Sequence, residues 1–98
     1  MAEVPLEDRQ LEIRDIRQSI LQALSPTHVE VTGSDAHFSA VVVAGAFEGK
    51  SRIEQHQMIY ALFREEMANQ TIHALALRTC TPAEWERETN HETNKEKR

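Results

Sequence analysis

A change of hydrophobic period near Pro26 constrains the fold of this chain more than any other feature of its sequence. From residue 6 to residue 24, isoleucine and leucine recur at helical spacing with polar residues between them, which predicts an amphipathic helix. This helix should end before Pro26, because the residue that precedes a proline is disfavoured in helical geometry. Residues 28–32 then alternate polar and apolar side chains, as a half-buried strand does. The chain is therefore expected to combine helices and strands.

A short hairpin is the next predicted feature. The Gly-Ser-Asp sequence at 33–35 favours a turn, and residues 37–43 are rich in β-branched side chains. Strands joined by so short a connection run antiparallel. The strands at 28–32 and 37–43 should therefore pair with each other.

A long helix and a third strand are expected after the hairpin. Ser51 and Glu54 have the spacing of a capping box, in which each side chain binds a free backbone N–H at the start of a helix. The helix should run to about residue 69 and be followed by a strand at 72–78. This strand should lie parallel to one neighbour, because a helical crossover returns the chain in the same direction.

The C-terminal part of the sequence predicts a short helix and then a tail. Thr81 and Glu84 form a second capping box, and Trp85 should pack back on the domain. The residues beyond are polar and lack periodicity. We therefore expect a flexible segment at 1–5, one domain at 6–87 and a disordered polar tail at 88–98. The fold class is α+β in the order α-β-β-α-β-α, a three-stranded mixed sheet with helices packed on one side.

Composition excludes several classes of protein. The length of 98 residues suits one domain, and 11 basic against 16 acidic residues give a net charge of −5. This balance argues against a broad surface for nucleic acid or anionic membranes, although a local basic patch is possible. Cys80 is the single cysteine, so an internal disulfide is excluded. Without a signal-peptide pattern or a long apolar run, the expected location is the cytoplasm.

The five histidines are the compositional peculiarity of the chain. His37 directly follows the predicted turn, and His73 begins the third predicted strand. They could meet, because neighbouring parallel strands start at the same end of a sheet, and two imidazoles would make half of a metal site. A structural or incidental role for each is the alternative. The others are expected to have no function, His56 as a hydrogen-bonded structural side chain, and His28 and His91 as solvated ones.

No other cluster of reactive residues is predicted. Cys80 is expected to be a small buried side chain. About seven residues of strand, at ~3.3 Å each, separate it from His73, so the two lie roughly 23 Å apart and cannot bind one metal. The sequence contains no motif of a hydrolase nucleophile, a phosphate-binding loop or a zinc protease, and we expect no enzymatic activity.

Several motifs together resemble the BolA family, and most closely its short-hairpin, YrbA-like bacterial branch. The similarity spans about residues 10–87. The segments that carry it are HFSAVVV at 37–43, FEGKSR at 47–52, EQHQ at 54–57, IHAL at 72–75 and TPAEW at 81–85.

The resemblance implies a fold similar to class II KH domains and a function without catalysis. BolA-like proteins are partners of monothiol glutaredoxins, which hold a [2Fe–2S] cluster with glutathione, and they contribute ligands to that cluster. The family's principal ligand corresponds to His73. A second ligand comes from the loop between the first two strands, where His37 is the nearest candidate, unless it points into the sheet. The isolated chain is expected to hold no cofactor and to be a monomer or weak homodimer.

The alternative implied by the resemblance is a KH-like nucleic-acid-binding transcriptional regulator. Lys50, Arg52 and Arg64 would then contact DNA. The Gly-x-x-Gly clamp of KH domains is absent, because Arg52 stands three positions after Gly49. Residues 25–85 also carry 4 basic against 7 acidic side chains.

Overall fold

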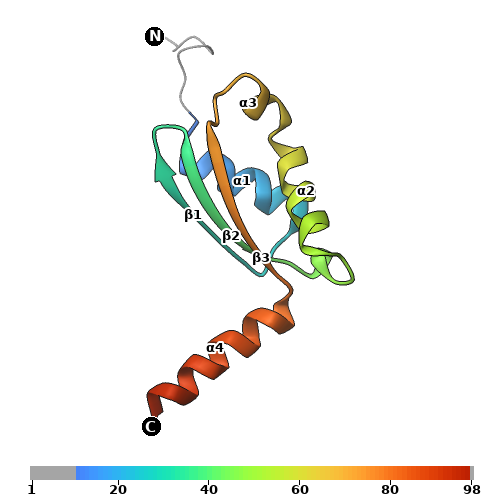
Figure 1. Ribbon diagram of the computed structural model, residues 1–98, viewed down its shortest axis with the longest axis vertical. Coiled ribbons are helices and arrows are strands. Elements are labelled where there is room, and N and C mark those ends of the chain that lie inside the picture. Colours follow the sequence, from blue (N-terminus) through green and yellow to red (C-terminus); the bar gives the residue numbers. More distant parts are fainter. Residues whose placement is uncertain (1–10, 98) are drawn as a thin grey trace.

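The computed structural model describes the backbone of residues 11–97 and the side chains of residues 11–89 (Figure 1). The predicted flexible segment at 1–5 and the start of the first predicted helix lie outside these ranges. The elements follow the order predicted from the sequence, with one additional helix: α1 Ile13–Leu24, β1 His28–Ser34, β2 His37–Val43, a 3₁₀ turn at Gly45–Phe47, α2 Arg52–Leu62, α3 Arg64–Ala68, β3 Ala74–Cys80 and α4 Pro82–Lys97.

A three-stranded sheet in the order β1-β2-β3 forms one layer of the domain. β1 and β2 pair in antiparallel orientation, and β2 and β3 in parallel orientation, as predicted. Helices α1 and α2 cover one face of the sheet, and α4 extends away from its end (Figure 1). The predicted α+β fold with a mixed sheet is confirmed.

The core lies between the sheet and the covering helices. Along β2, Phe38, Ala40 and Val42 are buried, whereas the alternate residues His37 and Ser39 are exposed, because successive side chains of a strand point to opposite faces. The helices and the remaining strands contribute the other buried apolar side chains, chiefly Ile16, Ile20, Val31, Phe47, Ile59, Phe63, Ile72 and Leu75.

The single helix predicted at 52–69 is broken at Phe63. This residue has φ −120° and ψ 29°, and its N–H donates to the Tyr60 carbonyl three residues back. Its side chain is buried in the core, which redirects the chain before α3 begins. The third strand also starts two residues later than predicted, because the N–H groups of Ile72 and His73 donate to Glu66 and Ala36 outside the sheet ladder.

Helix α4 continues through Lys97, although the sequence predicts a disordered tail from residue 88. Glutamate, lysine and arginine favour helix strongly even where no apolar stripe marks one. The first turn is anchored as predicted. Thr81 and Glu84 form their capping box, and the Trp85 ring stacks on His28 with 4.8 Å between ring centroids. In the part of the chain that the structure describes, no helix is long and apolar enough to cross a membrane.

The end of β1 depends on the absence of a side chain at Gly33. Its φ of 130° is a conformation that residues with a Cβ rarely adopt. A Cβ here would meet the carbonyl oxygen of His37 and lie 2.7 Å from the Cα of Phe38. Glycine therefore allows the two hairpin strands to approach each other directly before the turn.

We expect Gly33→Ala to lower the free energy of unfolding by about 3 kcal/mol, since it combines backbone strain with a steric clash. Gly45→Ala is the matched control, because nothing lies within 4 Å of a Cβ at that position. The control should change stability by no more than ~0.5 kcal/mol. Urea unfolding of both variants measures the difference, and equal stabilities would contradict this account of the hairpin.

Candidate metal-ligand site

His37 and His73 meet at one end of the sheet. His37 is the first residue of β2 and pairs with Ala74, the first residue of β3, so His73 lies directly before the paired position. Both side chains are exposed, and their rings are edge to face with centroids 5.5 Å apart. The two histidines thus meet, as the sequence allowed, and His37 is exposed, so the alternative in which it points into the sheet does not hold.

A single carbonyl group joins the two segments that carry the histidines. The Ala36 carbonyl oxygen accepts hydrogen bonds from the N–H groups of His73, at 2.8 Å, and Ala74, at 3.2 Å. It is aimed there by a two-residue turn in which Asp35 and Ala36 have φ values of 54° and 68°. These left-handed conformations match the twist of a tight hairpin. The turn therefore holds the start of β3 against the start of β2.

The same turn orients the His37 ring. Its Nδ1 lies 2.9 Å from the carbonyl oxygen of Asp35. A carbonyl can only accept, so Nδ1 carries the proton and Nε2 of the neutral ring keeps its lone pair. Metal-binding histidines are commonly oriented by such a bond on the nitrogen that does not bind the metal. The lone pair on Nε2 of His37 is thus available to a metal ion.

The histidine pair can contribute to a metal centre but cannot complete one. Within the described residues, no group of three or more histidine, cysteine or carboxylate side chains could hold a metal ion. Cys80 pairs with Val43 at the far end of β3, about 20 Å from His37 at ~3.3 Å per residue. Burial also raises the pKa of the Cys80 thiol, which disfavours the thiolate that binds metals. The described residues therefore place no further ligand beside the histidine pair.

The remaining histidines differ from their predicted environments. His28 is not simply solvated, because it stacks on Trp85 and its Nε2 lies 2.9 Å from a Glu30 carboxylate oxygen. His56 is partly buried, but the predicted hydrogen bond is missing at its Nε2, which is buried without a partner in the described structure. The side chain of His91 lies outside the described residues.

The three basic residues predicted to contact DNA do not form one patch. Lys50 and Arg52 lie at the start of α2, held by Gln55, whose amide donates to the Lys50 carbonyl at 3.0 Å. Arg64 follows the far end of α2. At 1.5 Å per residue, about 18 Å of helix separates it from Arg52.

The sequence of the whole domain matches a known family. A family model described as BolA-like protein matches residues 5–84. The chain belongs to the BolA family. The acid stress protein IbaG of Escherichia coli is 36% identical over 78 residues, which cover 80% of this chain and 93% of the relative. The DNA-binding transcriptional regulator BolA of the same species is 37% identical over 81 residues, covering 72% of this chain and 76% of the relative.

A solved BolA structure has the same fold. The BolA domain of SufE1 from Arabidopsis thaliana is 34% identical, with a TM-score of 0.66, over 74% of this chain and 93% of that domain. The family and fold predicted from the sequence motifs are therefore confirmed. The two bacterial relatives are named for a stress response and for transcriptional regulation, and neither name states a catalytic activity.

Sequence reasoning found both histidines but missed the groups that position them. The supports are the backbone carbonyls of Asp35 and Ala36, which have no side-chain signature. An available signal was the short Ser-Asp-Ala-His connection, because Asp tolerates the left-handed region and a two-residue turn requires it.

We expect the neutral His37 ring to carry its proton on Nδ1. Two-bond ¹H–¹⁵N correlation spectra at about pH 8, where an unperturbed histidine is neutral, identify the protonated nitrogen. His28 is the internal comparison, since its Nε2 faces Glu30 and should carry the proton. A His37 ring protonated on Nε2 would contradict the described hydrogen bond to Asp35.

Proposed function

We propose that this BolA-family chain is a non-enzymatic adaptor that binds a monothiol glutaredoxin and shares its [2Fe–2S] cluster, in cytoplasmic iron–sulfur trafficking or iron sensing. His73 is the principal ligand and His37 the second. The proposal is supported chiefly by the 5.5 Å approach of two exposed imidazoles at one sheet end. Membership of the BolA family supports it independently.

The number and type of ligands fit a shared cluster better than a resident one. Two imidazoles can satisfy at most half of the four ligand positions of a [2Fe–2S] centre. A partner with thiolates, such as the glutaredoxin cysteine and glutathione, can supply the others. This chain should therefore bind no cluster alone.

Histidine ligation would give the mixed complex properties that a thiolate-only cluster lacks. Replacing thiolate with neutral imidazole raises the reduction potential of a [2Fe–2S] cluster, as in Rieske centres. An imidazole must also lose its proton before it can bind metal, so acid favours its release. In this chain, the Asp35 carbonyl keeps the His37 ring in the binding tautomer, and the Ala36 carbonyl keeps His73 beside it.

Mixing the chain with a cluster-loaded monothiol glutaredoxin tests the proposal. Visible absorption and circular dichroism should change as imidazole replaces a ligand, and a stable complex should elute in gel filtration. His73→Ala should abolish the spectral change, and His37→Ala should reduce it. Far-ultraviolet circular dichroism checks that both variants remain folded.

His28→Ala is the matched control, because it removes a histidine from the opposite end of the sheet and leaves the pair intact. It should reproduce the wild-type spectra. The adaptor proposal fails if wild-type chain leaves the glutaredoxin spectrum unchanged and forms no complex, or if His73→Ala behaves as wild type. A silent His37→Ala would remove His37 from the ligand set.

Binding to nucleic acid is the second candidate. It is favoured by the name of one relative, a DNA-binding transcriptional regulator that is 37% identical. Two observations rank it below the adaptor. Arg64 is separated from Lys50 and Arg52 by the length of α2, and the net charge of −5 opposes binding to a polyanion.

A further inference from the structure

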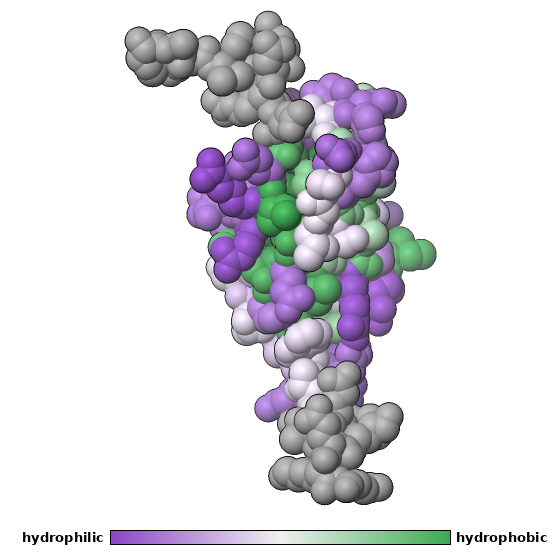
Figure 2. All heavy atoms as spheres, turned by 90° about the vertical axis from the view of Figure 1, so that its left-hand side faces the viewer, coloured by the Kyte–Doolittle hydropathy of each residue, from purple (hydrophilic) through white to green (hydrophobic). Residues whose placement is uncertain are grey.

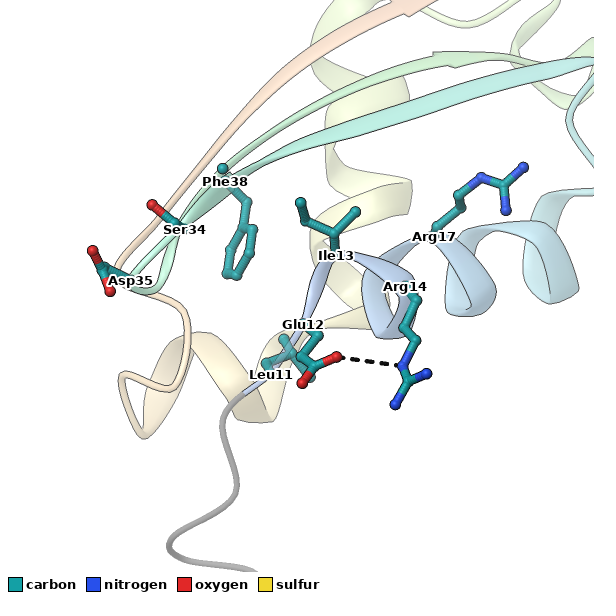
Figure 3. A pocket seen from close by; sticks show the side chains of 9 residues that line it. Leu11, Glu12, Ile13, Arg14, Arg17, Ser34, Asp35 and Phe38 are labelled. Carbon is teal, nitrogen blue, oxygen red and sulfur yellow. Dashed lines mark ion pairs between the residues drawn. The ribbon is translucent and has the colours of Figure 1, made fainter.

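An open furrow lies between the start of α1 and the β1–β2 hairpin. It has a volume of about 530 Å³, and its floor is formed by Leu11, Ile13 and Phe38 (Figure 3). Seen from the β1 side, a strip of apolar surface is bordered by hydrophilic side chains on the left and by side chains of intermediate hydropathy on the right (Figure 2). Phe38 faces this furrow, whereas the neighbouring His37 points to the opposite face of the sheet. Occupancy of the furrow can therefore be measured without the cluster.

The furrow runs beside a free sheet edge. β1 pairs only with β2 in the described sheet, so one side of its backbone has no strand partner. Ser34 and His37 flank the two-residue turn and form a hydrogen-bonded pair. Along an antiparallel ladder, hydrogen-bonded pairs alternate with non-hydrogen-bonded pairs, whose N–H and C=O groups point away from the partner strand. The N–H and C=O groups of Val31 and Gly33 consequently point outward. An extended backbone can bind there as a further strand.

Charged side chains beside the furrow indicate which side chains an occupant would carry. Arg17 forms no ion pair with any residue of the described range, and it lies at one end of the furrow (Figure 3). Arg14 pairs with Glu12 at 3.3 Å, but its side chain is 85% exposed. An occupant with apolar side chains toward the floor and an acidic side chain near Arg17 complements this surface. The apolar floor is unsuited to a phosphate backbone.

We propose that this furrow docks an extended segment of a partner protein, in which apolar and acidic residues alternate and which adds a strand to the outer edge of β1. A small molecule is a poorer fit, because small-molecule sites usually enclose most of the ligand surface. A second copy of this chain is also a poorer fit, since a pair related by twofold symmetry would bring a second set of Arg14 and Arg17 to the same edge.

The test uses the full-length chain, labelled with ¹⁵N, and a short blocked peptide of alternating valine and glutamate. We expect saturable shifts of the Val31, Gly33 and Asp35 amide signals, and slower hydrogen exchange at Val31 and Gly33 as their N–H groups become bonded. Two control peptides separate the contributions. Methylation of alternate backbone nitrogens should weaken binding at least about tenfold, and replacement of glutamate with lysine about fivefold or more.

Matched protein variants locate the binding. Arg17→Glu should weaken binding of the valine–glutamate peptide about fivefold, whereas Lys50→Glu makes the same change of charge outside the furrow and should have no effect. The proposal is overturned if the peptide causes no shifts, if the shifts lie elsewhere, or if Arg17→Glu and Lys50→Glu bind equally.

Two other occupants would give distinct results that also overturn the proposal. If the chain's own residues 1–10 fill the furrow, Val31 and Gly33 exchange slowly before peptide is added and the peptide fails to bind. If a second copy fills it, the same amide signals shift with protein concentration alone.

Discussion

The site depends most on the Ala36 carbonyl, which accepts two hydrogen bonds, from the N–H groups of His73 and Ala74. The bond from His73 fixes the start of a crossover strand to the tip of a hairpin. Parallel pairing of β2 and β3 alone would align the strands, but His73 lies before the ladder and needs this bond to be held beside His37.

Within the described residues, no third histidine, cysteine or carboxylate side chain joins His37 and His73 in a group that could hold a metal.

The hairpin tip connects two surfaces of the molecule. On one face, the Asp35 carbonyl orients the His37 ring, and on the other, Ser34 and Asp35 border the furrow beside α1. Gly33 permits the close approach of the strands that both surfaces require. A partner segment bound along β1 would restrict the same turn that holds the histidine pair. The short hairpin therefore contributes to both surfaces.

Patterns in the sequence predicted most of the fold, because capping boxes and hydrophobic periods are local. The Ser51 and Thr81 caps formed as expected, and β2 has its predicted bounds. The break at Phe63 and the late start of β3 could not be predicted, since both depend on tertiary contacts. The histidine pair followed from strand order, but the orientation of His37 depends on a backbone carbonyl that no residue type signals.

The most direct test of the adaptor account is pulsed electron paramagnetic resonance of the reduced mixed complex. The chain is labelled with ¹⁵N-histidine, and the glutaredoxin is left unlabelled. If His73 and His37 bind the cluster, the nitrogen couplings to the electron spin change from the ¹⁴N to the ¹⁵N pattern. Couplings that are absent, or that keep the ¹⁴N pattern when this chain is labelled, would show that its histidines are not ligands and would contradict the account.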